Sequence, residues 1–242
     1  VGSAIIRELE KPKHNRKIIL ESRKNLDLKD QYKVDSFIKK TNPDEIIIAA
    51  ARVGGIYANS TYPAEFIYDN LMIASNLIHA AYKNNIKKLL YLGSSCIYPR
   101  DSNQPIVEES LLTGSLEETN EWYAIAKIAG VKLCQAYRNQ YNCNFISAMP
   151  TNLYGIKDNY HLQNAHVIPA LMHRALVAKN NKSDKLTIWG SGKPTREFLF
   201  VDDLAESCVF LLDNYSEDIP INIGTGIEVS IIELAKKICE IV

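Results

Sequence analysis

The sequence has no net charge, few cysteines and no long apolar run, and each absence excludes a class of protein. Its 28 basic and 28 acidic residues balance, so no net field attracts DNA or an anionic membrane. The five cysteines are scattered without a C-x-x-C pair, which disfavours a disulfide framework and a zinc site. No run approaches the roughly 20 apolar residues that span a bilayer. We expect a protein of the reducing cytoplasm that binds no metal, nucleic acid or membrane.

The two ends of the sequence also lack something. The chain opens on "VGSAIIRELE", a helical pattern with no strand before it, and closes on "IICEIV", inside another amphipathic pattern. We therefore expect that both ends of a longer protein are missing. The 242 residues that remain are 46% hydrophobic, and a chain of this size buries about 70 to 75% of its unfolded surface. A sizeable core is expected.

Short apolar, β-branched runs alternate with longer helical patterns, which is typical of a parallel sheet covered by helices on both faces. Strands are expected at residues 17–20, 45–51, 88–94, 144–150, 186–190 and 220–224. Helices are expected at residues 1–10, 30–41, 62–84, 119–141, 166–180, 202–213 and 230–241. The fold class is therefore α/β with a doubly wound parallel sheet. Functional residues are expected just after the strands, where ligands bind in such sheets.

Tyr123 and Lys127 lie four residues apart in the expected helix 119–141, so their side chains are neighbours on one face. Bringing the pKa of a phenol from about 10 to neutrality requires about 4 kcal/mol. One ammonium about 4 Å away supplies about that much at an effective dielectric of about 20. We therefore predict that Lys127 makes Tyr123 able to exchange its proton near pH 7. A half-buried tyrosine beside a solvated lysine is the alternative for the pair alone.

A second candidate is the stretch "LLYLGSSCIYP" at residues 89–99. Its strand ends at Gly93, where the backbone can approach a ligand closely. It delivers Ser94, Ser95 and Cys96 to the crevice at the end of the sheet. The serines could instead cap a turn, and Cys96 could be a small buried apolar residue.

Together, this serine turn and the Y-x-x-x-K pattern resemble the extended short-chain dehydrogenase/reductase family. Within it the chain resembles the GDP-L-fucose synthases over essentially all of its length, through "ARVGGIYANSTYPAEFIYDNLMI", "LGSSCIYP", "YAIAKIAG", "MPTNLYG", "HVIPALMHR" and "WGSGKPTREFLFVDD". The resemblance implies a Rossmann-type NADP-binding domain at residues 1–160. Residues 161–242 are then mostly a smaller substrate-binding region, part of which rejoins the main sheet. The implied reaction converts GDP-4-keto-6-deoxymannose to GDP-L-fucose by 3,5-epimerisation and then NADPH-dependent 4-keto reduction.

By this resemblance, five side chains carry the chemistry. Ser94 polarises the C4 carbonyl and Tyr123 donates the proton. Lys127 lowers the pKa of Tyr123 and holds the nicotinamide ribose. Cys96 and His166 are the acid and base that epimerise C3 and C5, because hydrogens alpha to a ketone are acidic enough for a general base. Which of the two is the base at each carbon stays open, and His166 alone could be a polar loop residue.

The resemblance also implies the cofactor and substrate contacts. Arg23, just after an expected strand, suits the 2′-phosphate of NADPH, with a solvated arginine as the alternative. The other cofactor positions are Gly2, Asp27, Leu28, Leu92, Gly93, Ser94, Ser95, Lys127, Pro150, Thr151, Asn152, Leu153 and His166. The contacts to the GDP-sugar are Arg174, Trp189 and Arg196. Trp189 could instead lie in the core, and Arg196 could pair with Asp202 or Asp203.

The sequence departs from the family at its two ends. Family members open with a strand and a G-x-x-G-x-x-G turn that approaches the cofactor pyrophosphate at a helix N-terminus. Of these, only Gly2 remains, and the family's C-terminal stretch beyond Val242 is absent as well. Loss of a central strand exposes the neighbouring edges of a sheet. We therefore predict that this polypeptide binds NADPH weakly or not at all, a prediction that micromolar binding would show wrong.

Two other functions stay open. One is another nucleotide-sugar epimerase or dehydratase of the same fold, although the dehydratases carry acidic residues where this chain has Ser95 and Cys96. The other is an inactive cofactor-sensing or scaffold homologue, which the missing glycine turn favours and the intact catalytic residues disfavour. Relatives pair the helices at residues 62–84 and 119–141 across a two-fold axis into a four-helix bundle. By analogy a homodimer is expected.

Overall fold

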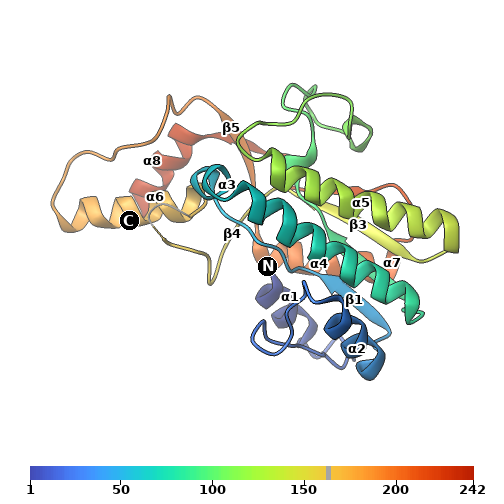
Figure 1. The fold of residues 1–242 in the computed structure, drawn as a ribbon. Coiled ribbons are helices and arrows are strands. Elements are labelled where there is room, and N and C mark those ends of the chain that lie inside the picture. Colours follow the sequence, from blue (N-terminus) through green and yellow to red (C-terminus); the bar gives the residue numbers. More distant parts are fainter. Residues whose placement is uncertain (162–164) are drawn as a thin grey trace.

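The computed structural model describes residues 1–161 and 165–242 and has the predicted α/β fold. Its main sheet has four parallel strands in the order β1-β2-β3-β6. These strands are β1 (Glu45–Ile48), β2 (Lys88–Leu92), β3 (Phe145–Pro150) and β6 (Ile221–Ile223). Figure 1 shows the sheet enclosed between two layers of helices, as in a doubly wound fold.

The apolar pattern of the strands explains why both faces are covered. All five residues of β2 are buried. Leu89 and Tyr91 contribute to one apolar cluster, whereas Leu90 and Leu92 contribute to another, because successive residues of a strand point to opposite faces. A strand that is apolar on both faces needs a helical layer on each side.

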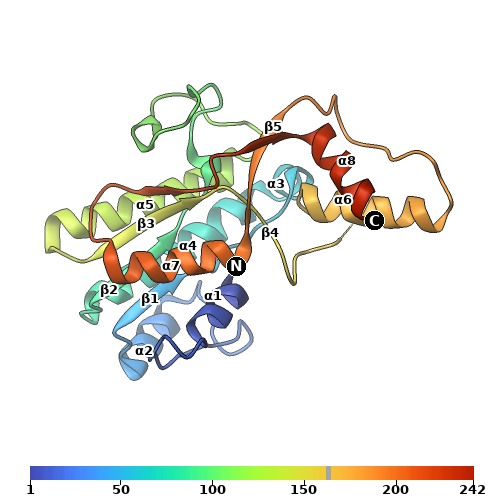
Figure 2. The same ribbon diagram turned by 180° about the vertical axis from the view of Figure 1, so that it is seen from behind.

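The two helical layers come from different parts of the chain (Figure 1, Figure 2). The first contains α2 (Gln31–Thr41), α4 (Pro63–Lys83) and α5 (Glu121–Tyr141). The second contains α1 (Gly2–Leu9) and α7 (Val201–Asn214), which pack against each other. In the first layer α5 lies so close to β2 that a Cβ added at Gly130 would overlap the Tyr91 ring.

A second, smaller region follows β3. Its sheet has the order β4-β5-β7, with β4 and β5 parallel and β5 and β7 antiparallel. The strands are β4 (Asn152–Tyr154), β5 (Thr195–Phe200) and β7 (Glu228–Ser230). Beside them α6 (Val167–Asn180) packs on α8 (Ile231–Ile241) through a small apolar cluster. The short helices are α3 (Ile56–Thr61), η1 (Ser95–Ile97) and η2 (Glu108–Ser110).

Two of the predicted strands are wrong. Residues 17–20 form no strand and Leu20 is 61% exposed, because an isolated extended segment needs a neighbouring strand to bind its backbone groups. No strand among the described residues pairs with it. Residues 186–190 form no strand either, since Leu186 and Ile188 pack against the cluster between α6 and α8. The four other strands and the seven helices lie where the pattern predicts them, and β4, β5 and β7 were missed.

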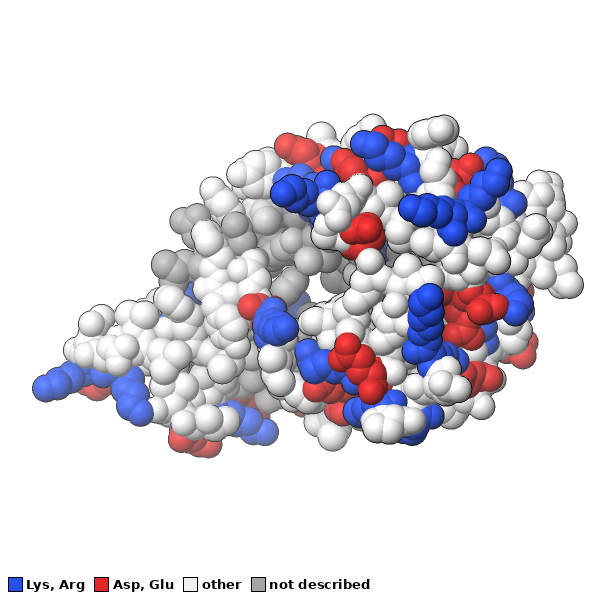
Figure 3. Space-filling model, turned by 90° about the horizontal axis from the view of Figure 1, so that it is seen from below, with Lys and Arg blue, Asp and Glu red and all other residues white. Residues whose placement is uncertain are grey.

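The charged side chains on the surface and the lengths of the helices match what the composition predicts. On the face in Figure 3, basic and acidic side chains are interspersed. None of the helices in the described ranges is both long and apolar enough to span a bilayer. Near residue 221 the chain returns to the main sheet, where β6 pairs with β3. The division near residue 160 stays a proposal.

Candidate functional site

The end of β2 places the serine turn against α5. The backbone N–H of Gly93 donates to the carbonyl of Ala148 at 2.8 Å, which ties the end of β2 to β3. Ser94 then caps η1, because its Oγ accepts from the backbone N–H of Cys96 at 3.3 Å. Ser94 also hydrogen-bonds to Tyr123 and thereby lowers the pKa of that phenol. The serine therefore caps a turn and faces the candidate proton donor as well.

Ser95 and Cys96 occupy the first turn of η1 and are both half-buried. Cys96 is one of five free cysteines. It lies close enough to Tyr123 to contribute electrostatically to the raised pKa of the phenol. Cys96 is therefore a neighbour of the reacting groups and is not sealed in the core.

Lys127 is buried beneath this turn, with only 4% of its surface exposed. Its Nζ donates to the carbonyl of Leu92 at 2.7 Å. The ammonium lies 4.9 Å from the ring centroid of Tyr91 and 5.8 Å from that of Tyr123. Burial lowers the pKa of Lys127 from 10.5 to about 8, because an apolar environment disfavours the charged form. The alternative of a solvated lysine is wrong.

The pKa of Tyr123 corrects one prediction. Burial is the largest cause that raises this pKa above its ordinary value, Cys96 adds to the rise, and the hydrogen bond with Ser94 opposes it. Lys127 lies over the ring and is bonded to a backbone carbonyl, so it does not acidify the phenol as the spacing predicts. That prediction is wrong for this structure. Tyr123 keeps its proton near pH 7, which is the form that a proton donor needs.

The segment after β3 crosses the same end of the sheet. Pro150 is buried at the end of β3, and Leu153 pairs with β5. Thr151 Oγ1 and Asn152 Nδ2 both donate to the backbone carbonyl of Glu197 at 3.0 Å. The carboxylate of Glu197 in turn accepts from the backbone N–H of a neighbouring glycine loop at 2.7 Å. Glu197 therefore fixes the path of residues 150–153.

The predicted adenine side lies between α1 and α2. Arg23 is exposed, so its guanidinium is accessible to a phosphate. Asp27 Oδ1 accepts from the backbone N–H of Lys29 at 3.1 Å, and the carbonyl of Leu28 accepts from a side chain of α4 at 2.9 Å. Gly2 begins α1, where an added Cβ would meet nothing within 4 Å.

The donor groups of the site fit a nicotinamide dinucleotide phosphate. An ammonium has three N–H donors, and the bond from Lys127 to Leu92 leaves two that can reach ribose hydroxyls. The Arg23 guanidinium suits a phosphate monoester. The hydroxyls of Ser94 and Tyr123 lie together beside Lys127, at the strand end where such cofactors bind.

His166 lies in the smaller region. It is the N-cap of α6, its carbonyl accepts from Ala170 N at 3.0 Å, and its side chain is exposed. In the described part of the chain, no hydrogen bond or ion pair joins His166 to Cys96. Ser94, Cys96, Tyr123 and Lys127 come together, whereas no hydrogen bond or ion pair among the described residues joins His166 to any of them.

Of the predicted GDP-sugar contacts, Trp189 and Arg196 are exposed and Arg174 is half-buried. The guanidinium of Arg174 lies 4.3 Å from the centroid of the Trp189 ring, and Trp189 is 67% exposed, so the core alternative for Trp189 is wrong. Arg196 donates to the adjacent carbonyl of Thr195 at 2.7 Å. Asp202 pairs with Arg7, and the described residues contain no ion pair between Arg196 and either aspartate. The pairing alternative for Arg196 is wrong as well.

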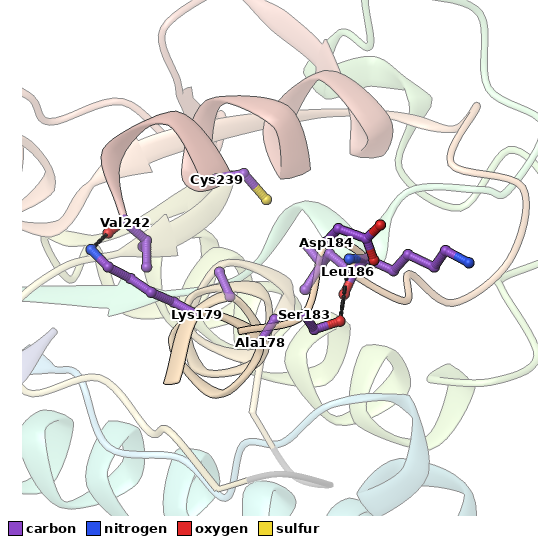
Figure 4. A pocket seen from close by; sticks show the side chains of 9 residues that line it. Ala178, Lys179, Ser183, Asp184, Leu186, Cys239 and Val242 are labelled. Atoms are coloured by element: carbon purple, nitrogen blue, oxygen red, sulfur yellow. Dashed lines mark hydrogen bonds between the residues drawn. The ribbon is translucent and has the colours of Figure 1, made fainter. Parts of the chain in front are cut away.

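A separate hollow of about 310 Å³ lies between α6 and α8 (Figure 4). Its walls include Lys179, Asp184, Cys239 and Val242. None of the predicted site residues lines it. Within the described ranges, no group of three or more His, Cys, Asp or Glu side chains could hold a metal ion.

The profile of the NAD dependent epimerase/dehydratase family matches residues 1–224. The chain belongs to this family. Over 242 residues it is 57% identical to GDP-L-fucose synthase 1 of Arabidopsis thaliana and 56% identical to GDP-L-fucose synthase of Sinorhizobium fredii. Both alignments cover 100% of this chain, and they cover 75% and 76% of those proteins. The NAD dependent epimerase/dehydratase fold is thus expected throughout the chain.

A solved member of the family agrees with this assignment. The crystal structure of a GDP-L-fucose synthetase from Naegleria fowleri bound to NADP superimposes with a TM-score of 0.90 at 30% sequence identity. The superposition covers 99% of this chain and 74% of that one. The likeness therefore extends over both regions described above.

Several residues of the site were missed by sequence reasoning. Arg52 follows β1, Asp69 and Asn70 are buried on α4, and Glu197 lies on β5. Asp and Asn in the middle of an otherwise apolar helix are a signal that could have indicated the α4 residues, because buried polar groups need partners. Nothing local distinguishes Glu197 from an ordinary strand residue.

Proposed function

We propose that the chain carries the catalytic centre of an NADPH-dependent GDP-L-fucose synthase. Its substrate is GDP-4-keto-6-deoxymannose, and its product is GDP-L-fucose. One observation carries the proposal: Ser94, Cys96, Tyr123 and Lys127 meet at the end of β2. They do so in a chain that is 56 to 57% identical to GDP-L-fucose synthases over its whole length.

The cofactor is NADP(H), which supplies the hydride for C4 when bound. Lys127 and Ser94 would hold its nicotinamide end beside residues 92–95 and 150–153. Arg23 would hold its 2′-phosphate. Two observations support this cofactor. The Lys127 ammonium has N–H groups besides the one bonded to Leu92, and Arg23 is exposed. In addition, the Naegleria relative was solved with NADP bound.

The reduction uses the groups around β2. Ser94 Oγ donates a hydrogen bond to the C4 oxygen, which stabilises the negative charge that develops there. Tyr123 then gives its phenolic proton to that oxygen, and its raised pKa ensures that the proton is present at neutral pH. The ammonium of Lys127 stays hydrogen-bonded to the Leu92 carbonyl, and its other two N–H donors would bind the nicotinamide ribose.

The epimerisation precedes the reduction, because hydrogens at C3 and C5 lose their acidity once the C4 ketone is gone. Cys96 and His166 are the proposed acid and base, and each carbon requires one group on each face of the sugar. Cys96 already lies near Tyr123. Binding of the sugar between the two regions would bring His166 into reach.

The proposed assembly is a homodimer in the cytoplasm. Helices α4 and α5 each contain 21 residues and lie side by side, as a shared four-helix bundle requires. Exposed Tyr68 and Tyr141 on these helices offer apolar area to a second copy. The five free cysteines support a reducing compartment. Sedimentation velocity tests the assembly, and a monomer at micromolar concentration would contradict it.

The experiment follows both halves of the reaction. Because the relatives are longer, activity is measured on an extended chain, in which the 242 residues are joined at both ends to the matching segments of the Sinorhizobium protein. In D₂O we expect deuterium at C3 and C5 of the product, one NADPH consumed per turnover and release of GDP-L-fucose. Cys96→Ser should abolish deuterium incorporation while leaving NADPH binding intact.

Two outcomes would contradict the proposal. Product formed without net consumption of NADPH would indicate a simple 4-epimerase. Absence of any turnover with normal NADPH binding would indicate a cofactor-sensing protein. Titration of NADPH into the 242 residues alone separately tests the weak binding expected from the sequence.

A further inference from the structure

Three of the buried polar side chains in this structure lie on one helix. Asp69, Asn70 and Asn76 of α4 are each less than a tenth exposed, and Asn70 is only 2% exposed. The rest of the buried face of α4 is apolar. Burying a polar group costs free energy unless it finds a partner. The partners of these three side chains therefore show what the helix holds in place.

Asn70 bonds to both backbone groups of Arg52. Its Oδ1 accepts from the backbone N–H of Arg52 at 2.8 Å, and its Nδ2 donates to the backbone carbonyl of Arg52 at 3.0 Å. This is the pattern that a neighbouring strand would provide. β1 ends at Ile48, so the side chain takes over where strand pairing stops. Asn70 thus fixes the segment 49–55 at the carboxyl end of the main sheet.

Asp69 joins that segment to the predicted adenine side. Its carboxylate lies 3.1 Å from Lys29 Nζ and 3.2 Å from Arg52 Nη1. Burial raises the pKa of Asp69, but the two cations more than offset this and the pKa lies below its usual value. The carboxylate is therefore charged at neutral pH and bridges two loops. About two turns further along α4, Asn76 Nδ2 donates to the carbonyl of Leu28 at 2.9 Å.

Phe66 extends the same face toward the proton donor. The Arg52 guanidinium lies 5.5 Å from the Phe66 ring centroid. The Phe66 ring meets the Tyr123 ring edge to face, with centroids 6.5 Å apart and an interplanar angle of 72°. The Arg52 guanidinium is thus separated from the tyrosine by a single aromatic ring.

We propose that Asp69, Asn70 and Asn76 are positioning residues for the cofactor. They fix the loops at residues 27–30 and 49–55 in the unliganded protein, so that the dinucleotide does not have to order these loops when it binds. The proposal rests on the proposed function, because it assumes that these loops border the NADP(H) site. Pre-ordered loops raise affinity by removing the entropy cost of ordering.

The first test measures hydrogen exchange of the unliganded 242 residues by mass spectrometry. Asn70→Leu keeps the number and branching of the side-chain heavy atoms and removes the bonds to Arg52. We expect peptides that cover residues 49–55 to exchange about tenfold faster, while peptides of β2 exchange as in the wild type. Asn84→Leu is the control: Asn84 ends the same helix, and the hydrogen bonds of its side chain go to Asp35 and to the carbonyl of Ala80 and not to residues 27–30 or 49–55.

The second test measures the dissociation constant of NADPH in the extended chain. We expect a rise of about tenfold for Asn70→Leu, with kcat at saturating NADPH within about twofold of the wild type. Asp69→Asn keeps the shape of the side chain and removes its charge. It should raise the dissociation constant of NADPH about threefold and make that constant less sensitive to salt. This milder variant keeps the test open if Asn70→Leu folds poorly.

The outcomes separate the two proposals. An extended wild-type chain that does not bind NADPH would overturn the proposed function. A wild-type chain that binds NADPH, with Asn70→Leu and Asn84→Leu equal in affinity, would overturn the positioning role alone. Unchanged exchange at residues 49–55 in Asn70→Leu would overturn it too.

Discussion

The end of β2 and the region around α6 differ in how much of their geometry the chain fixes by itself. At β2, Lys127 is buried and bonded to Leu92, and Ser94 bonds to Tyr123. Around α6, His166 and Trp189 are exposed, and Arg196 donates a hydrogen bond to the carbonyl of the adjacent Thr195. The proposed groups for proton donation are thus preorganised by the core, whereas the proposed sugar-binding groups have few contacts that fix them.

The largest effect is expected at the proton donor. Tyr123→Phe in the extended chain should reduce the rate of NADPH oxidation by about 10²- to 10⁴-fold, because it removes the proton and leaves the ring in place. Single-turnover absorbance measures this rate. Trp122→Phe changes the neighbouring, more exposed ring and should leave the rate within about twofold. An unchanged rate in Tyr123→Phe would remove the distinction between the two regions.

The next effect is the pH dependence of stability caused by Lys127. Its pKa falls from 10.5 to about 8 on folding, so the unfolded chain binds more protons between these values, and stability rises as pH rises through this window. The buried ammonium costs on the order of 3 kcal/mol near neutral pH. The free energies of unfolding of the wild type and Lys127→Met, measured in urea, should differ by an amount that shrinks from pH 8 to pH 10.5. A constant difference would contradict this.

A smaller effect is expected from packing beneath the site. Gly130→Ala adds a methyl group that overlaps the Tyr91 ring, and overpacking of this kind costs about 1 to 3 kcal/mol. Gly2→Ala is the matched control, because its Cβ meets nothing within 4 Å. The free energies of unfolding in urea should differ accordingly. Equal values would show that the contact between α5 and β2 gives way easily.

The smallest effect is expected in the exposed region. Trp189→Ala removes a ring that contacts Arg174 and is otherwise largely in solvent. The free energy of unfolding should fall by about 0.5 kcal/mol, while KM for the GDP-sugar rises. A loss of more than about 2 kcal/mol would show that this region is as tightly packed as the end of β2.

The main elements could be predicted from sequence because their apolar patterns are continuous. β2 and α5 are examples, since every residue of β2 is buried. Residues 17–20 have an equally apolar pattern and form no strand, because a strand depends on a neighbour that no local pattern reveals. The site residues that directly follow β2 could be predicted as well, because the continuous apolar pattern of β2 shows where that strand ends.

Long-range contacts set the limit on predicting the site. The spacing of Tyr123 and Lys127 gave their shared helix face correctly, but not the burial that raises the pKa of the phenol or the carbonyl that binds the ammonium. Likewise, Asn70 reaches Arg52 across 18 residues and Glu197 reaches Asn152 across 45. Such pairs depend on how layers pack, which the sequence pattern of each element does not contain.

The pairing of β6 with β3 has a consequence for synthesis on the ribosome. β3 is complete at Pro150, but its partner strand begins only at Ile221. At roughly 5 to 20 residues per second, the edge of β3 stays open for several seconds while the intervening chain emerges. The nascent protein therefore passes through a stage in which that edge can pair with another chain, and the arrival of β6 ends it.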